Sequence, residues 1–238
     1  MQLLTHSIRN GIAWHALGSG VIAGTTLKNY AGENADRMAQ LEALRGDLGM
    51  EPALIAGGEQ AHGRRIETLG ADSGDGVKLF PETDGLVTAE RGILLHIVTA
   101  DCVPLLLFDD QAGVIAAVHA GWKGTQQRIV QRAIETMTGL GARPERIKIL
   151  AGPCICQAHY EVSPEMAAAF AEEFGDGCVE GHRLDLPAVN LLQIRECGVP
   201  ENGLYQSGLC TWEETALLHS YRRDGQAAGR MITFIVLT

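Results

Sequence analysis

TADCVPLLLFDDQAGVIAAVHAGWKG, residues 99–124, holds two short apolar runs on either side of a polar turn. The runs cover residues 103–108 and 113–118, and their length and composition predict two buried strands. The turn between them, residues 109–112, is short enough to make the strands an antiparallel pair. Cys102 precedes the first strand and His119 follows the second. We therefore expect a thiol and an imidazole at one edge of a sheet, on rigid strands whose ends are open to solvent.

The segments on both sides of this pair predict a mixture of strands and helices. Apolar residues at helical spacing predict helices over 34–48 and 124–140, the second with Thr125 as its N-cap. Capping residues followed by proline predict two more helices, which start at Ser163 and Asp185 and end at Gly175 and near Gly198. Polar, glycine-rich residues 67–83 predict a surface loop. Short apolar segments predict strands at 12–16, 53–57, 84–88, 92–98, 147–151 and 231–237.

This order of elements favours an α/β (α+β mixed) fold with a mixed β-sheet. We find no internal repeat and no convincing linker, so we expect one domain over residues 1–238.

Composition and charge exclude several classes of protein. The formal net charge is −10 and no Lys/Arg cluster stands out, which argues against a nucleic-acid surface or adsorption to an anionic membrane. No stretch approaches the ~20 apolar residues that span a bilayer. The N-terminus lacks the pattern of a signal peptide, and six cysteines are too few for a secreted disulfide scaffold. We expect a cytoplasmic protein with reduced thiols, either a monomer or a homodimer.

His62, Cys102 and His119 each lie at the end of an apolar segment, beside Gly or Ala. Two imidazole nitrogens and one thiolate sulfur are a known ligand set for catalytic zinc, with a fourth position open to water or substrate. The alternative is that Cys102 is a small buried apolar residue and each histidine a hydrogen-bonded turn residue. The sequence separations are long, so the residues alone leave both interpretations open.

The junction after His119 is a candidate anion site. Gly121 and Gly124 would let backbone amides face a ligand at a helix start, and Lys123 would add a charge. The spacing of a P-loop is absent. The alternative is an ordinary glycine-containing turn in which Trp122 packs against its neighbours.

Two further clusters carry polar chemistry. Arginines near the C-terminus would clamp phosphate, or else lie on a solvated loop: Arg222, Arg223 and Arg230. Cys154 and Cys156 form a Cys-x-Cys pair that could bind metal, but no partner pair of ligands is evident in the sequence. His159 and Glu161 resemble half of the zinc-deaminase signature, but the order and the cysteine spacing are wrong, so that fold is rejected.

Taken together, these motifs resemble the YfiH-like, laccase-domain family. The resemblance covers about residue 53 to the end and rests on motifs in the family's order: Gln60-x-His62-Gly63, Asp84-Gly85-Leu86-Val87, Thr99-Ala100-Asp101-Cys102, His119-Ala120-Gly121-Trp122-Lys123-Gly124, Gly152-Pro153, Tyr160-Glu161-Val162, Asp185-Leu186, Ser220-Tyr221-Arg222-Arg223-Asp224 and Gly229-Arg230. It implies mixed β-sheets flanked by helices, a layered sandwich related in shape to the catalytic domain of cytotoxic necrotizing factor toxins. It also implies a metal site on His62, Cys102 and His119, with Zn²⁺ as cofactor and Cu²⁺ as the alternative.

The resemblance further implies a purine nucleoside phosphorylase. Such an enzyme cleaves adenosine or inosine with phosphate into the base and ribose 1-phosphate, deaminates adenosine and cleaves methylthioadenosine. Its catalytic residues would be Asp101, Lys123 and Arg230, with Asp101 as a proton carrier or a group that orients a ligand; a strand-end cap is the alternative for Asp101. The residues expected to bind nucleoside and phosphate are Gln60, Gly121, Trp122, Gly124, Arg222 and Arg223.

Three other functions stay open at this point. A copper-dependent polyphenol oxidase is the family's older label, but the chain has eight histidines and no His-x-His pair, which multicopper oxidases need. A metal-free cysteine hydrolase or deamidase would use Cys102 as nucleophile and His119 as base. A non-catalytic metal-binding module would have a closed site with four ligands.

Overall fold

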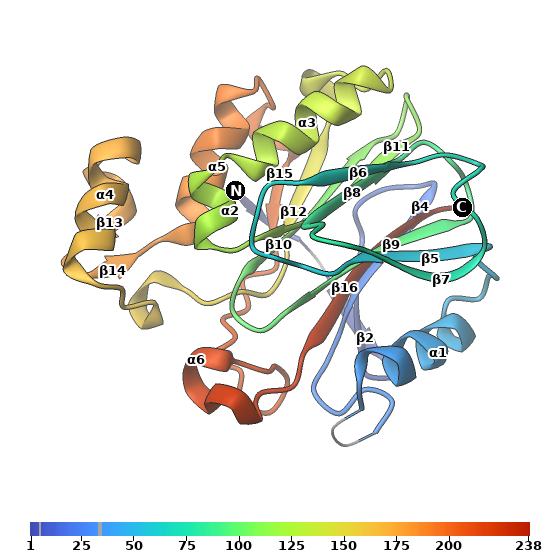
Figure 1. Cartoon of the computed structure of the whole chain (residues 1–238), viewed down its shortest axis with the longest axis horizontal. Helices are drawn as coiled ribbons and strands as arrows, with labels where there is room; N and C mark the ends of the chain where they lie inside the picture. Colours follow the sequence, from blue (N-terminus) through green and yellow to red (C-terminus); the bar gives the residue numbers. More distant parts are fainter. Residues whose placement is uncertain (5, 33–34) are drawn as a thin grey trace.

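The computed structural model describes residues 1–4, 6–32 and 35–238, and within them the strands form two seven-stranded sheets (Figure 1). The first sheet has the order β1 (Gln2–Leu3), β15 (Leu204–Gln206), β12 (Lys148–Ala151), β10 (Val103–Asp109), β11 (Val114–Ala120), β8 (Gly85–Thr88) and β6 (Ile66–Leu69). The second has the order β2 (His6–Arg9), β3 (Ile12–His15), β4 (Val21–Thr26), β16 (Met231–Leu237), β9 (Ile93–Thr99), β5 (Leu54–Gly58) and β7 (Gly76–Phe80). Each sheet contains parallel and antiparallel pairs, which confirms the predicted mixed α/β class.

Helices cover the outer faces of both sheets. Figure 1 shows α2, α3 and α5 on the side of the first sheet, α1 on the side of the second, and α4 with the β13–β14 pair projecting at one end. The helices are α1 (Arg37–Asp47), α2 (Trp122–Gln126), α3 (Ile129–Gly139), α4 (Pro164–Phe174), α5 (Leu186–Glu196) and α6 (Tyr221–Asp224). The short pair is β13 (Val179–Glu180) and β14 (Arg183–Leu184), and single 3₁₀ turns lie at Pro144–Arg146, Gln157–His159, Asp176–Cys178, Glu201–Gly203 and Gly225–Ala227. None of the helices in the described part of the chain has the length and apolar character that crossing a membrane requires.

Strand β10 shows why the sheets stack. Successive side chains on a strand point to opposite faces. Leu105 and Leu107 pack in the core between the first sheet and its helices, whereas Leu106 and Phe108 pack in the core between the two sheets. A strand covered on both faces must be apolar at every position, and this accounts for the uninterrupted apolar run from 103 to 108.

The β10–β11 pair has the predicted antiparallel geometry. Val103 pairs with Ala120 and Pro104 with His119, so Cys102 and His119 lie at the same end of the pair. The Asp109 carboxylate closes the turn at the other end by accepting hydrogen bonds from the backbone N–H groups of Gln111 and Ala112. The prediction of two buried strands joined by a tight turn is confirmed.

Between residues 54 and 109 the chain alternates between the two sheets. Strands β5, β7 and β9 run parallel in the second sheet, and each is followed by β6, β8 or β10 in the first. The three connections from the second sheet to the first are residues 59–65, 81–84 and 100–102, and we call them crossings. Because β5, β7 and β9 are parallel, all three crossings leave the second sheet at the same end. The C-terminal end of β11 arrives at this end too, because β11 is antiparallel to β8 and β10. This arrangement places four loops that are distant in sequence at one corner of the molecule.

Two sequence predictions are wrong. Residues 67–83 are not simply a surface loop, because β6 and β7 form there and extend one edge of each sheet. The helix predicted over 124–140 is two helices, α2 and α3, separated by Arg128 with a φ of +62°. Thr125 lies inside α2 and is buried, and its hydroxyl accepts a hydrogen bond from Asn190 instead of capping a helix.

The remaining helix predictions hold. Ser163 and Asp185 cap α4 and α5 through their side chains, as predicted. The helix predicted from residue 34 begins at Arg37 with Asp36 as its N-cap, and residue 34 itself lies outside the described residues.

Candidate metal centre

The structure brings His62, Cys102 and His119 together at the corner where the crossings meet. One ligand atom from each residue lies within 4.8 Å of those from the other two. The two imidazole rings are nearly perpendicular, at 82°, with centroids 4.8 Å apart. His119 is buried, Cys102 is half-buried and His62 is exposed, so the group is rooted in the fold and open on one side.

Asp84 holds two of these side chains in place. Its buried carboxylate accepts backbone hydrogen bonds from Ala61, His62 and Gly63 at 2.8–3.1 Å, and these bonds fix the loop that carries the His62 ring. The same carboxylate lies 2.8 Å from Nδ1 of His119, while the backbone N–H of His119 donates to the Asp84 carbonyl. Because a carboxylate can only accept, it keeps the proton on Nδ1 and leaves Nε2 of His119 free to bind a metal.

Gly121 leaves the space between the three side chains open. A Cβ atom at this position would stand 3.0 Å from Cδ2 of His62, 3.2 Å from Sγ of Cys102 and 3.6 Å from Cε1 of His119. Gly124, one turn later in α2, allows close packing of that helix on the His62 loop, because its Cβ would come within 2.9 Å of the Gly63 carbonyl oxygen. Gly121 and Gly124, which were expected to bind an anion, thus leave room for the cluster and its loop.

The protonation equilibria of the three residues are coupled. Burial would raise the pKa of the Cys102 thiol, but hydrogen bonds from His119 and His62 outweigh it and lower that pKa to about 6. Burial would lower the pKa of His119, yet its hydrogen bonds to Asp84 and Cys102 raise it to about 9. The pKa of Asp84 lies below its ordinary value, since the His119 hydrogen bond and the backbone donors outweigh burial. Without a metal, the site therefore favours a Cys102 thiolate beside a protonated His119 at neutral pH, and a metal that binds Nε2 would displace that proton.

These features fit a metal ion. A thiolate and two imidazoles converge, one imidazole is oriented by a carboxylate behind it, and a glycine keeps the centre clear. Three protein ligands with an open side are typical of a catalytic site rather than a closed structural one.

The cluster opens into a cleft of about 610 Å³, within the usual size of a small-molecule site. Three aromatic side chains and two arginines are among the residues that line it: Trp122, Tyr160, Tyr221, Arg222 and Arg230. Gln60, Val98, Thr99, Ala100 and Asp101 complete the lining next to the three candidate ligands.

Both arginines of the cleft are anchored but keep donors to spare. Arg222 lies over the Tyr160 ring at 5.1 Å and donates to the Glu161 carbonyl. Arg230 lies 5.7 Å from the centre of the Tyr221 ring and donates to two carbonyls of its own loop. A guanidinium carries five N–H donors, so each retains some for an anion.

Asp101 lies in the cleft wall with both carboxylate oxygens engaged. One accepts from the hydroxyl of Thr211 and the other from the backbone N–H of Arg222, each at 2.6 Å. Its φ of +102° is rare for a residue with a side chain. Asp101 thus ties the C-terminal segment to the loop that carries Cys102.

Gln60 also has a backbone partner. Its side-chain amide donates to the carbonyl of Val98 and accepts from the backbone N–H of the same residue, at 2.8 and 2.7 Å. This pairing positions the start of the His62 loop beside the end of β9.

Four predicted substrate or catalytic residues lie outside the cleft lining: Gly121, Lys123, Gly124 and Arg223. The Arg223 guanidinium donates to the carbonyls of Thr211, Trp212 and Leu218 and pairs with Asp224, which holds the C-terminal loop together. Lys123 is exposed, with its ammonium 5.4 Å from the centre of the Trp122 ring.

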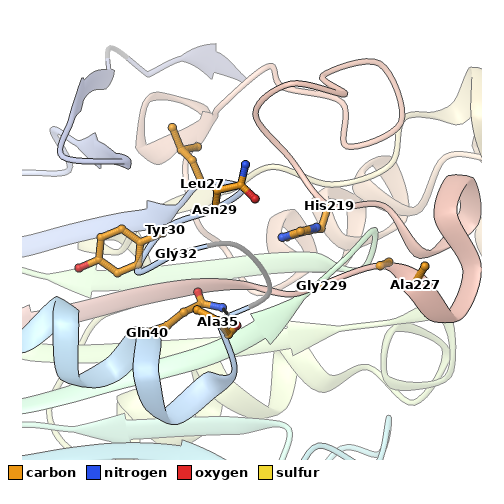
Figure 2. Close-up of a pocket in the computed structure, with 10 residues that line it drawn as sticks. Leu27, Asn29, Tyr30, Gly32, Ala35, Gln40, His219, Ala227 and Gly229 are labelled. Atoms are coloured by element: carbon orange, nitrogen blue, oxygen red, sulfur yellow. Dashed lines mark hydrogen bonds between the residues drawn. The ribbon is translucent and has the colours of Figure 1, made fainter.

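A smaller cavity of about 200 Å³ lies between α1 and the C-terminal segment, and Figure 2 shows His219, Tyr30 and Gln40 around it. The Gln40 amide is used within the fold, by Thr26 and by the carbonyls of Ala35 and Arg230. Among the described residues, no group of potential metal ligands gathers in its lining.

Sequence reasoning missed the importance of Asp84 and of the two tyrosines. Asp84 directly precedes a buried strand, as Cys102 does, and this shared position was the available signal. Tyr160 and Tyr221 lay in recognised motifs without an assigned role.

Comparison with known proteins gives the family. A profile of the family described as multi-copper polyphenol oxidoreductase laccase matches residues 18–238, which extends the resemblance beyond the motifs that begin near residue 53. A purine nucleoside phosphorylase of Deinococcus radiodurans is 41% identical over 225 residues, 93% of this chain and 85% of that protein. Adenosine deaminase RL5, from an unknown prokaryotic organism, is 33% identical over 232 residues, 92% of this chain and 88% of that protein.

The fold comparison agrees. The crystal structure of the hypothetical protein YfiH of Bacillus licheniformis matches with a TM-score of 0.87 over 97% of each chain, at 24% identity. The chain thus shares the fold of YfiH and belongs to the family described as multi-copper polyphenol oxidoreductase laccase.

Proposed function

We propose that the protein is a zinc-dependent purine nucleoside phosphorylase. It would cleave inosine or adenosine with phosphate into the base and ribose 1-phosphate, with adenosine deamination and methylthioadenosine cleavage as further activities. The observation that carries this proposal is the opening of the His62–Cys102–His119 group into a cleft that also holds two arginines and three aromatic side chains. Relatives named as a purine nucleoside phosphorylase and as an adenosine deaminase support it.

The residues of the cleft suit the two substrates. Phosphate would bind the free donors of Arg222 and Arg230, because guanidinium groups form strong charge-assisted hydrogen bonds with phosphate oxygens. The purine would pack on the aromatic side chains of Trp122, Tyr160 and Tyr221. Asp101 would position Arg222 by holding its backbone N–H.

His62, Cys102 and His119 would hold the metal ion that acts as the electrophile. A zinc ion bound by His62, Cys102 and His119 would polarise a phosphate oxygen, or lower the pKa of water toward ~7 for the deamination. Asp84 would keep His119 oriented through Nδ1, and Gly121 would keep the reacting face accessible.

The metal-free hydrolase is the rival that the geometry makes most concrete, since Asp84, His119 and Cys102 form a connected carboxylate–imidazole–thiol series. His62 argues against it. A nucleophilic thiol needs one oriented base, whereas here the ligand atom of a second imidazole also lies within 4.8 Å of the same sulfur. Two imidazoles and one thiolate that converge in this way suit a metal site.

The test supplies inosine and phosphate to the purified, zinc-loaded chain and measures hypoxanthine and ribose 1-phosphate. Formation of both in equal amounts, with loss after chelation and recovery with zinc, is the expected result. If neither product appears, the phosphorylase proposal fails. Metal analysis of untreated protein that finds copper, together with oxidation of a phenol under air, would favour the oxidase. Rapid alkylation of Cys102 by iodoacetamide in the protein as isolated would favour the hydrolase.

A further inference from the structure

A second group of potential metal ligands lies apart from the three residues of the candidate metal centre. The thiols of Cys156 and Cys210 and the carboxylate of Glu213 place their ligand atoms within 4.8 Å of one another. The two sulfurs are 3.1 Å apart, and Sγ of Cys156 is 3.9 Å from Oε1 of Glu213. Cys210 is buried, Cys156 half-buried and Glu213 exposed, so the group is reached from the surface.

The backbone explains how two distant segments meet here. Cys154 and Cys210 form an isolated parallel bridge, in which the N–H of Cys154 donates to the Leu209 carbonyl and the N–H of Thr211 donates to the Cys154 carbonyl. Cys156 follows on one segment and Glu213 on the other. The missing partners of the Cys-x-Cys motif are thus 54 and 57 positions away from Cys156, where no spacing rule would find them.

We propose that Cys156, Cys210 and Glu213 bind a thiophilic divalent cation, Zn²⁺, independently of the candidate catalytic metal. Two thiolates and a carboxylate are accepted zinc ligands, and water would complete a tetrahedron. Zinc–sulfur bonds of about 2.3 Å put two thiolates about 3.8 Å apart, so the sulfurs, now 3.1 Å apart, need to separate by about 0.7 Å. An ion at this place cross-links the 154–156 segment to the 210–213 segment.

The surroundings of the group supply the supporting contacts that a metal site needs. The backbone N–H of Cys156 donates to Sγ of Cys210 at 3.3 Å, a contact that stabilises a thiolate. Nε2 of His159 lies 3.1 Å from Oε1 of Glu213, and its ring stacks on Trp212 at 5.4 Å and 16°, which restrains the carboxylate.

A route for the ion is present as well. A cavity of about 400 Å³ is lined by Cys154, Cys156, Cys210 and Glu213, so a hydrated cation reaches the sulfurs from solvent. A Cys156–Cys210 disulfide is the competing fate of the two thiols. It would use neither the carboxylate nor the imidazole that gather around them.

The experiment counts zinc equivalents. The reduced full-length chain, stripped by a chelator, is titrated with Zn²⁺ against a chromophoric chelator. Cys156→Ser and Cys210→Ser should each bind one equivalent fewer than the unmodified protein. Cys197→Ser, which changes a half-buried thiol at the end of α5, should bind the same number. Retention of the full number of equivalents in both Cys156→Ser and Cys210→Ser would overturn the proposal.

Co²⁺ spectroscopy distinguishes this site from the candidate metal centre. In the Cys102→Ser background, Co²⁺ should give a near-ultraviolet thiolate charge-transfer band that disappears when Cys156→Ser is added. This result stands whether or not Cys102 itself binds metal, so failure of the proposed function leaves it intact. Absence of the band in Cys102→Ser would contradict the second site.

A cysteine variant that fails to fold would also lose zinc, so Glu213→Gln serves as a second test. Its side chain is exposed and both thiols remain, so this variant should fold. It should weaken the affinity of one zinc equivalent by roughly tenfold or more. Peptide mapping under non-reducing conditions provides the last check. A chain isolated with a Cys156–Cys210 disulfide, which takes up no additional zinc after reduction, would show a redox pair in place of a metal site.

Discussion

The Asp84 carboxylate and Nδ1 of His119 lie 2.8 Å apart, and this buried contact joins the connection before β8 to the end of β11. Asp84 stands at the entrance to β8 and His119 near the end of β11, which are neighbouring antiparallel strands. The same carboxylate accepts the backbone N–H groups of residues 61–63. One side chain therefore sets the position of both histidines of the candidate metal centre.

Asp84→Asn should lower zinc affinity by roughly tenfold to a hundredfold, the usual cost of losing a carboxylate behind a metal-bound histidine. The asparagine side chain would direct its NH₂ donors at the backbone N–H groups of residues 61–63 or at the Nδ1–H of His119. Two donors facing each other repel, so some of these hydrogen bonds would be lost. Competition titration against a chelator measures the affinity. Asp75→Asn, an exposed carboxylate in the loop before β7, is the control and should behave like the unmodified protein. Unchanged affinity in Asp84→Asn would contradict the orienting role.

Gly121→Ala should reduce the zinc content of the purified protein while the fold persists. The added methyl group would contact His62 and Cys102 at 3.0 and 3.2 Å, closer than most real Cβ contacts, and would crowd the space between the ligands. Gly46→Ala in α1 is the matched control, because its Cβ meets nothing within 4 Å and helix propensity should stabilise the chain by about 0.5–1 kcal/mol. Elemental analysis and thermal unfolding of both variants distinguish crowding from a general glycine effect.

The helices and strands that the sequence predicts correctly are those with strong local signals, such as a cap or a continuous apolar run. Caps at Ser163 and Asp185 and the apolar runs of β10, β11 and β16 mark elements whose interactions are largely local or wholly buried. Strands β4, β6 and β7 were not predicted from the sequence because they are short, contain glycine or are half-exposed. Such strands form because they pair with strands that are distant in the sequence. The break at Arg128 was hidden for a similar reason, since α2 packs on the His62 loop through Gly124, a contact that no helical periodicity records.

At the site, sequence reasoning found the reactive residue types but not their arrangement. His62, Cys102 and His119 stood out because reactive side chains at strand ends are few, and the structure places them together. Asp84 was not distinguishable from a strand-end cap, because its role depends on crossings between two sheets. Arg222, Arg223 and Arg230 looked alike in sequence. In the structure, the carbonyls of its own loop engage Arg223, whereas Arg222 and Arg230 line the cleft.

Arg230→Met should raise the KM for phosphate by roughly tenfold and leave the KM for inosine within about twofold, because only phosphate carries the charge that the guanidinium would bind. Steady-state phosphorolysis with each substrate varied in turn gives both constants. Arg132→Met, on the exposed face of α3, should change neither constant. Equal increases in both KM values would indicate a general disturbance of the cleft rather than lost phosphate binding.

His96 links stability to pH at a place away from the cleft. It lies in β9 without solvent exposure, and its Nε2 accepts hydrogen bonds from the Arg37 guanidinium at 2.8 and 3.0 Å. Burial and then the nearby Arg37 charge lower the pKa of His96 from 6.5 to about 3. Protonation would place two cations against each other in a buried site, so the folded chain keeps this imidazole neutral.

Below pH 6.5 the unfolded chain protonates His96 while the folded chain does not, so unfolding takes up a proton and acid favours it. The contribution to stability is complete above the unfolded pKa. It should fall by about 1.4 kcal/mol per pH unit toward the folded pKa near 3. His96→Gln, which keeps an acceptor for Arg37, should flatten the pH dependence of the unfolding free energy by about one proton. His182→Gln, at an exposed position, should leave it unchanged. Denaturant melts between about pH 6.5 and 4.5 measure the slope, and equal slopes in His96→Gln and the unmodified chain would refute the assignment.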